Sequence, residues 1–133
     1  MFPWHANNEA AAGIDYVDGF KKQYGEDFFV MSARTIIVML SQAINDAQST
    51  DPTNVAFAME GMKIKGPVGD ITMRQSDHQI QQPLYILSWS KAGGKDVPYD
   101  MENTGYGWKT EEKVNAYVAT QPTSCQMTRP ARP

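Results

Sequence analysis

Cysteine, long apolar runs and an excess of positive charge are all missing or scarce in this sequence, and each shortage excludes a class of protein. The 133 residues include one cysteine, Cys125, which excludes an internal disulfide framework and a cysteine-based zinc cluster. The longest apolar runs, such as residues 36–40, are far shorter than the roughly 20 residues that cross a bilayer. Twelve basic and fifteen acidic side chains give a net charge of −3, which offers no basic surface for nucleic acid. The sequence therefore predicts neither a membrane-spanning nor a nucleic-acid-binding protein.

An export signal is also missing from this chain. Residues 1–5 do not combine a basic region with an apolar stretch, so the sequence predicts no signal peptide here. With 41% hydrophobic residues, the chain is long and apolar enough for one folded unit with a single core. We expect one partial domain over residues 1–133, of the α/β class, in which helices come first and a strand meander follows.

The first helix is predicted over residues 8–24, where apolar side chains recur at spacings of three and four. Asn7 or Asn8 can cap its start, and Gly25 is typical of a helix end.

Two further helices are expected before residue 61. Residues 32–48 are apolar on much of the helix circumference, so we expect this helix to lie between other elements. Its broad apolar face contains Ile36, Ile37, Leu40 and Ile44. Asp51 as the cap and Pro52 at the first position then predict the start of a short third helix, which Gly61 ends.

Strands are expected after this helical part, which takes up residues 1–61. A hairpin and crossover region is predicted for residues 62–90, and an irregular C-terminal segment for residues 91–133. The strand candidates are residues 62–65, 69–74 and 84–89, with a polar connection at 75–82. The last of them is apolar on both faces, so we expect both to be covered. In the C-terminal segment, residues 99–108 are predicted to be irregular and residues 111–118 to form one or two helical turns.

Catalysis and metal binding have little support in the motifs. Adjacent Asp77 and His78 would need Cys125 nearby to activate a thiol, or further ligands to hold a metal, and the sequence gives no sign of either. A loop histidine bonded to neighbouring backbone is the simpler interpretation. Neither the pair Gly66 and Gly69 nor the pair Gly105 and Gly107 has the spacing of a phosphate loop, and the sequence contains no Gly-x-Ser-x-Gly nucleophile elbow. The sequence therefore predicts no enzyme and no cofactor.

An aromatic cluster near the C-terminus allows two interpretations. Tyr99, Tyr106 and Trp108 surround Gly105 and Gly107. They could wall a slot for a ligand, or they could fix the C-terminal segment by burying large rings, which is the interpretation that we favour.

Several segments, taken in order, carry a family resemblance. They are AINDAQSTDP (43–52), VAFAMEGM (55–62), GPVGDITMR (66–74) with the nearby DHQ (77–79) and PLY (83–85), GYGWKT (105–110) and TSCQMTRP (123–130). Together they resemble periplasmic substrate-binding proteins of branched-chain amino-acid-type ABC transporters. Two positions depart from the family pattern: Phe28 stands where proline is usual, and Gln48 where glycine is usual. We expect Gln48 to extend its helix by one residue.

The resemblance implies a fold and a mechanism. It covers the C-terminal portion of a protein with two α/β lobes joined by three crossovers, so the chain resembles a fragment of a longer periplasmic protein. A ligand would bind between the lobes, close them and be passed to a membrane permease. The resemblance places Pro83 and Leu84 near the hinge and, less directly, Asp77, His78 and Tyr85 near the ligand. It also makes Cys125 a candidate for a bridge to an upstream residue of the parent protein.

The expected function is therefore that of a solute-binding component, or a truncated fragment of one, which captures a small amino acid, amide or aromatic acid for uptake. The alternative is a ligand-sensing regulatory domain of the same fold with no part in transport. A lobe without its partner leaves apolar faces and strand edges uncovered, so we also expect the fragment to self-associate.

Overall fold

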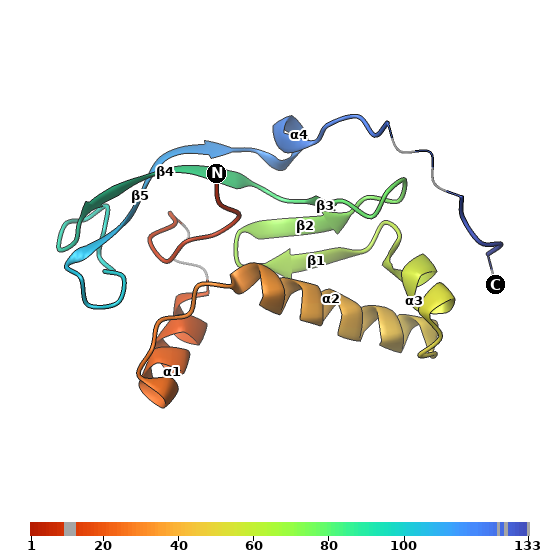
Figure 1. Ribbon diagram of the computed structural model, residues 1–133, viewed down its shortest axis with the longest axis horizontal. Helices are drawn as coiled ribbons and strands as arrows, with labels where there is room; N and C mark the ends of the chain where they lie inside the picture. Colours follow the sequence, from red (N-terminus) through yellow and green to blue (C-terminus); the bar gives the residue numbers. More distant parts are fainter. Residues whose placement is uncertain (10–12, 125, 127, 133) are drawn as a thin grey trace.

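Three helices come first along the chain and strands follow, so the protein is a mixed α/β chain as expected. The computed structural model describes all residues except 10–12, 125, 127 and 133. The elements are α1 (Ile14–Tyr24), α2 (Met31–Ala47), α3 (Pro52–Met59), β1 (Lys63–Gly66), β2 (Gly69–Met73), β3 (Ile80–Gln81), β4 (Leu84–Lys91), β5 (Tyr106–Val114) and α4 (Ala116–Ala119). Figure 1 shows an elongated molecule, with the β4–β5 ribbon toward one end and α3 near the other. In the described part of the chain, no helix has the length and apolar character needed to cross a membrane.

Helix α1 begins at Ile14, so the predicted start at residue 8 is wrong. Asn7 and Asn8 do not cap it, because their carboxamides donate to carbonyl oxygens elsewhere, in the loop before β5 and in the N-terminal segment. Asparagine side chains compete for whichever backbone groups lie near, which is why the sequence could not fix this cap. The predicted end is confirmed: Gly25 adopts φ +74° and donates its N–H to the carbonyl oxygen of Lys21.

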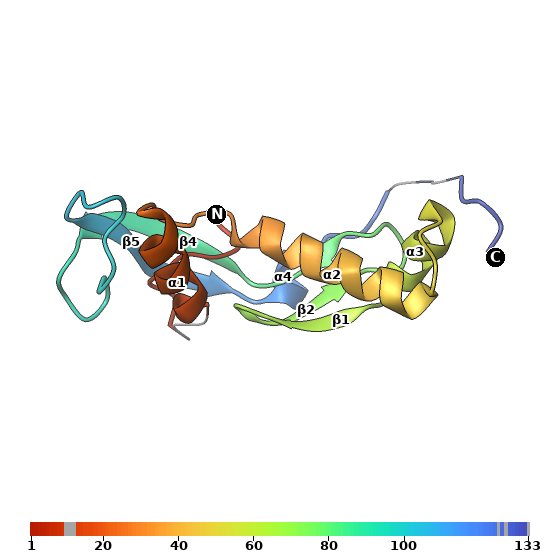
Figure 2. The ribbon, with the colours of Figure 1, turned by 90° about the horizontal axis from the view of Figure 1, so that it is seen from below.

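The buried face of α2 is not the predicted one, although Ile44 of the predicted face is partly buried against the core. The buried residues Met31, Thr35, Met39 and Ala43 recur every four positions. The exposed apolar residues include Ile36, Ile37, Val38 and Leu40. Residues four apart share a helix face, so the methionine face contributes to the core and an aliphatic face points to solvent. The expectation that α2 lies between other elements is therefore wrong: it runs alongside β1 and β2 with one side open, as Figures 1 and 2 show.

The ends of α2 and α3 follow from two polar residues. Gln48 adopts the left-handed conformation at φ +48°, and its N–H and Nε2 both donate to the carbonyl oxygen of Asn45. It therefore ends α2 in the role that glycine usually fills, and the expected one-residue extension is wrong. The predicted start of α3 is confirmed. Asp51 Oδ1 accepts two backbone N–H groups of the first turn, at 2.9 and 3.1 Å, and Pro52 is the first helical residue.

Strands β1, β2 and β3 form an antiparallel sheet in that order. The β1–β2 hairpin closes with Gly66 opposite Gly69, and both strands lie within a residue of their predicted bounds. Strand β3 is short and falls in the stretch predicted as a polar connection. Ile71 and Met73 of β2 are buried in the core, where they join residues of all three longer helices and of the N-terminal segment.

Strand β5 is the largest departure from the predicted structure. Residues 99–108 were expected to be irregular and 111–118 to be helical, yet a nine-residue strand runs through both, antiparallel to β4 with Leu84 opposite Val114. Strand propensity depends on cross-strand partners far away in sequence, which a local pattern does not contain. The segment 91–133 is therefore not irregular throughout.

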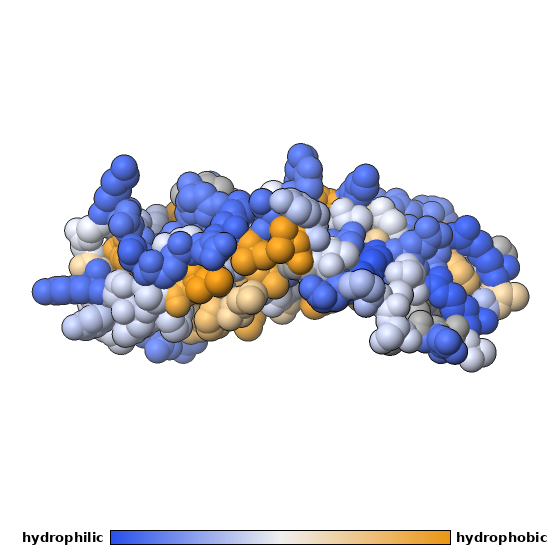
Figure 3. Space-filling model, turned by 90° about the horizontal axis from the view of Figure 1, so that it is seen from above, coloured by the Kyte–Doolittle hydropathy of each residue, from blue (hydrophilic) through white to orange (hydrophobic). Residues whose placement is uncertain are grey.

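Strand β4 is not covered on both faces, which corrects a second expectation. Tyr85 is fully buried, whereas Ile86 and Trp89 are 38% and 46% exposed. Figure 3 shows hydrophobic side chains gathered on the upper side of the molecule, the side where β4 and β5 lie in Figure 1. In this chain the ribbon thus leaves apolar surface open.

The C-terminal tail lies against α3 and the β2–β3 turn. Arg129 donates to Glu60 and to two carbonyl oxygens of the turn, at 2.6 and 2.9 Å. Arg132 adds an ion pair with Glu60 at 3.3 Å. Cys125 lies outside the described residues, so its bridge to an upstream residue stays a prediction.

Candidate functional site

Asp77 and His78, two of the predicted ligand residues, lie in the turn between β2 and β3. Arg74 donates to Asp77 from Nε at 2.7 Å and from a second nitrogen, and it holds the pKa of that carboxyl well below its usual range. Asp77 also accepts the N–H of Gln79 at 3.1 Å. These hydrogen bonds occupy the carboxylate oxygens of Asp77 within the turn, so the side chain has few acceptor positions left for a ligand.

His78 faces the C-terminal tail. It adopts φ +55°, and its Nε2 lies 3.7 Å from Glu60 Oε1. With Phe57 and Arg129 it lines a cavity of about 190 Å³ between α3 and the tail. In the described ranges, no group of three or more histidine, cysteine, aspartate or glutamate side chains could hold a metal ion.

Tyr85, the third predicted residue, lies elsewhere in β4. Its ring meets the His5 ring edge-on, with centroids 5.1 Å apart, and the ammonium of Lys113 lies 5.7 Å from its centre. Burial and the nearby charge of Glu9 raise the pKa of its hydroxyl. Pro83 directly precedes β4, at the end of the ribbon where the chain leaves the three-stranded sheet. The structure thus keeps Asp77 and His78 in one turn and separates Tyr85 from them.

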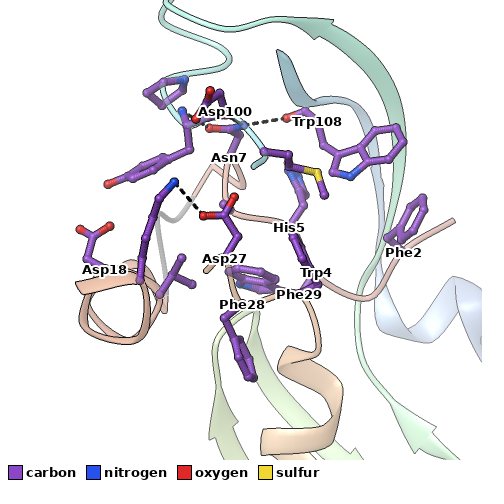
Figure 4. A pocket seen from close by; sticks show the side chains of 16 residues that line it. Phe2, Trp4, His5, Asn7, Asp18, Asp27, Phe28, Phe29, Asp100 and Trp108 are labelled. Carbon is purple, nitrogen blue, oxygen red and sulfur yellow. Dashed lines mark hydrogen bonds and ion pairs between the residues drawn. The ribbon is translucent and has the colours of Figure 1, made fainter. Parts of the chain in front are cut away.

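A larger cavity, of about 340 Å³, lies among the N-terminal segment, α1, the turn after α1, the loop between β4 and β5, and β5 itself (Figure 4). Its aromatic lining consists of Phe2, Trp4, Phe28, Phe29, Tyr99 and Trp108. Its polar lining includes His5, Asn7, Asp18, Lys21, Asp27 and Asp100. An apolar cavity with a few polar groups is the usual form of a small-molecule site, so this cavity is the candidate site of the chain.

The side chain of Asn7 connects two walls of this cavity by hydrogen bonds. Asn7 donates from Nδ2 to the carbonyl oxygens of Tyr99 and Trp108, at 2.8 and 3.1 Å, and accepts the Tyr99 N–H at 2.8 Å. Gly107 makes the close approach possible, because a Cβ there would lie 2.3 Å from the Tyr99 carbonyl oxygen. The N-terminal segment and β5 therefore meet in one defined geometry.

The aromatic cluster predicted near the C-terminus divides between two places. Tyr99 and Trp108 line the cavity, and Trp108 packs against Phe2 with ring centroids 5.3 Å apart. Tyr106 instead stacks on Trp89 outside the cavity, at 6.2 Å. Two of the three rings thus line a cavity, which the less favoured interpretation requires, and whether that cavity takes a ligand stays a prediction.

A charged pair forms one wall of the cavity. Lys21 Nζ lies 2.7 Å from Asp27 Oδ1, and the Glu102 N–H donates to Asp27 Oδ2 at 2.5 Å. The bond to Asp27 and the charges of Asp100 and Asp18 raise the pKa of Lys21. Burial opposes the ionisation of Asp27, but the bonds from Lys21 and Glu102 outweigh it and lower the pKa. Both members of the pair are therefore charged at neutral pH.

His5 completes the polar lining. Its side chain is 3% exposed, and its Nε2 lies 2.8 Å from Thr110 Oγ1. Burial lowers the pKa of the imidazole, so it is neutral at pH 7. Its Nδ1 is buried and has no hydrogen-bond partner in the described part of the chain.

Most residues of this cavity were not singled out from the sequence. No local motif in the sequence points to Lys21 or Asp27, and Phe28 stands out only as a departure from the family pattern. The sequence does contain one usable sign: the aromatic residues Phe2, Trp4, Phe28 and Phe29 occur in two short segments outside the predicted helices and strands or at their edges, where an exposed loop does not require large rings.

Comparisons with known proteins support the resemblance seen in the sequence. The model of the periplasmic binding protein family matches residues 1–95. The Leu/Ile/Val-binding protein homolog 4 of Brucella melitensis is 28% identical over 131 residues, which cover 94% of this chain and 30% of that protein.

Solved structures give the same result for the fold. A leucine-, isoleucine-, valine-, threonine- and alanine-binding protein of Brucella ovis, in a closed conformation, aligns with a TM-score of 0.75 and 25% identity over 96% of this chain and 34% of that one. A solute-binding protein of an ABC transporter from Rhodopseudomonas palustris, in complex with 3,4-dihydroxybenzoic acid, aligns with a TM-score of 0.66 and 23% identity over 85% and 29%.

The chain thus spans about a third of the length of the proteins that it matches. The matched family is one of binding proteins, in agreement with the prediction that the chain is not an enzyme. From the match over residues 1–95, we conclude that the chain belongs to the periplasmic binding protein family.

Proposed function

We propose that this chain is part of the solute-binding component of an ABC transporter, which captures a small amino acid, amide or aromatic acid for uptake. The observation that carries the proposal is the family match over residues 1–95. Of the two structural relatives, one is a leucine-, isoleucine-, valine-, threonine- and alanine-binding protein, and the other was solved in complex with 3,4-dihydroxybenzoic acid. Ligands of this size suit a cavity of about 340 Å³ that offers both apolar rings and charged groups.

The proposed mechanism is a clamp. We infer that the chain is the C-terminal part of a two-lobed periplasmic protein, whose closed form delivers the ligand to a membrane permease. A ligand closes such a protein only through its higher affinity for the closed state. Pro83 and Leu84 are proposed as hinge residues, because they connect the three-stranded sheet to the long β4–β5 ribbon.

Within this chain, the cavity residues are stronger candidates for ligand contact than the three residues predicted from the sequence. Asp77 is engaged by Arg74, and Tyr85 is fully buried. His78 lines the smaller cavity, beside the tail. Asp77, His78 and Tyr85 stay proposals for the longer protein, in which further surfaces meet this chain.

Ligand binding by the purified chain tests the proposal. Thermal unfolding is followed with leucine, isoleucine, valine and 3,4-dihydroxybenzoate, and each shift is checked by titration calorimetry. A ligand that binds only the folded state stabilises it by about 2.7 kcal/mol at a hundred times its dissociation constant. We expect at least one ligand to raise the midpoint, and the proposal is overturned for this chain if none does.

Two variants locate the binding. Phe29→Ala removes a ring that lines the cavity and is 47% exposed, so binding is expected to weaken with little loss of stability. Tyr117→Ala is the matched control, because that ring is 79% exposed and does not line this cavity. Equal binding by the two variants would place the ligand outside the cavity.

A further inference from the structure

The charges that line the large cavity are not balanced. Asp18, Asp27 and Asp100 contribute three carboxylates, and Lys21 is the one fully charged base among its described lining residues. His5 adds no positive charge, because burial lowers its pKa. The cavity therefore carries an excess of negative charge, while its remaining surface is aromatic.

The ammonium group of Lys21 lies where the negative charges of the three carboxylates act together. It bonds to Asp27 at 2.7 Å, and the charges of Asp100 and Asp18 act on it from other elements of the wall. The same negative charge acts on Tyr99, because burial and the charge of Asp18 raise the pKa of its hydroxyl. Figure 4 labels Asp18 and Asp27 among the side chains that line the cavity, and a dashed line marks the ion pair of Asp27 with Lys21. A second ammonium in this region would meet carboxylates that one lysine does not neutralise, whereas a carboxylate would be repelled.

The aromatic wall favours the same kind of ligand. The face of an aromatic ring carries partial negative charge, so rings attract organic cations within about 6 Å of their centroids. Trp4, Tyr99 and Trp108 supply large rings to this cavity, and Phe28 and Phe29 supply two smaller ones. An ammonium on an apolar body thus finds both attractive electrostatics and apolar contact.

We infer that this cavity selects ligands by an ammonium group on a small apolar body and discriminates against ligands whose only charge is a carboxylate. The inference rests on the proposed ligand-capture function and narrows it: amines and amino acids bind here, and aromatic acids without an amine do not.

Three probes of matched shape test this selectivity. The full chain is titrated calorimetrically with 2-phenylethylamine, 2-phenylethanol and 3-phenylpropionate, which carry positive, zero and negative charge on the same phenylethyl body. Fluorescence of Trp4 and Trp108, with Trp89→Phe as the background, reports whether the cavity is the site. We expect the amine to bind more tightly than the alcohol, by about tenfold if cation–π and ionic contacts together contribute about 1.4 kcal/mol. The carboxylate is expected to bind weakest.

A variant that removes one negative charge from the cavity provides a second test of the selectivity. Asp18→Asn removes one carboxylate from an exposed site and is expected to lower the preference for the amine over the alcohol by up to about fivefold. Asp46→Asn, on α2 and outside the cavity lining, makes the same change of charge and should leave both affinities unchanged.

Each outcome is decisive. Tighter binding of the carboxylate, equal binding of all three probes, or no binding of any probe overturns the inference. The proposed function is tested separately by the amino acid and dihydroxybenzoate panel: binding of dihydroxybenzoate alone would support capture of a solute while refuting selection of an ammonium.

Discussion

Asn7→Ala is expected to destabilise the protein strongly, because one carboxamide joins the N-terminal segment to two other parts of the chain. Its Nδ2 donates to the Tyr99 and Trp108 carbonyl oxygens, and its Oδ1 accepts the Tyr99 N–H, all between 2.8 and 3.1 Å. A hydrogen bond contributes about 1 kcal/mol net, so the loss of three costs about 3 kcal/mol.

Urea denaturation, followed by tryptophan fluorescence at neutral pH, measures this loss. A cost of about 3 kcal/mol lowers the midpoint by about 1–3 M, because the dependence on urea is typically about 1–3 kcal/mol per molar. Asn45→Ala is the control. Asn45 is an exposed residue of α2, where alanine favours the helix, so its free energy of unfolding should be unchanged or slightly higher.

Asn7→Asp separates hydrogen bonding from side-chain size. Aspartate keeps the acceptor for the Tyr99 N–H, but it places a carboxylate oxygen against the two carbonyl oxygens that now accept from Nδ2. This nearly isosteric variant should therefore lose at least as much stability as Asn7→Ala. The reasoning is refuted if Asn7→Ala stays within about 0.5 kcal/mol of the parent, or if Asn7→Asp is tolerated.

Three further predictions follow from other contacts. Gly107→Ala should lower the thermal midpoint, by overpacking that costs about 1–3 kcal/mol, because the new Cβ would lie 2.3 Å from the Tyr99 carbonyl oxygen; a parent-like melt would contradict it. Arg74 keeps the pKa of Asp77 below its value in the unfolded chain, so ionised Asp77 stabilises the fold above about pH 4 and this stabilisation is lost as the pH falls. Urea denaturation from pH 6 to pH 2 should therefore show that the free energy of unfolding of Asp77→Asn declines less steeply than that of the parent. Ile37→Asp, at a side chain 64% exposed on α2, should reduce self-association in sedimentation velocity without unfolding the chain, and a parent that is monomeric at high concentration would remove the basis for this prediction.

Local patterns in the sequence were sufficient for the features that local physics determines. Asp51 followed by Pro52 predicted the start of α3, and Gly25 the end of α1, because capping involves residues within a few positions. The β1–β2 hairpin followed in the same way, from two short strands around a Gly-Pro turn.

Features that depend on distant partners were not predictable in this way. Strand β5 forms because Val114 and its neighbours pair with β4, about thirty residues earlier in the chain. The buried side of α2 is the Met39 side, while the more hydrophobic Ile37 is exposed, so hydrophobicity alone ranked the two faces wrongly. Predicting the large cavity would require long-range information as well as local patterns, because its walls come from both halves of the sequence and only the fold brings Lys21 and Asp27 beside Tyr99.

The separation in sequence between the walls of the cavity determines when it can form. The N-terminal segment pairs with β4 through Phe2 and Tyr85, and Asn7 bonds to groups 92 and 101 residues later. Closing such long loops costs entropy that only the completed contacts repay. During synthesis the first residues leave the ribosome long before their partners exist, whereas α2, α3 and the β1–β2 hairpin can assemble from neighbouring sequence. The candidate binding site is therefore expected to be among the last parts of the chain to fold, and a polypeptide that stops before Trp108 would lack the ring that packs against Phe2 and one of the two carbonyl groups that bond to Asn7.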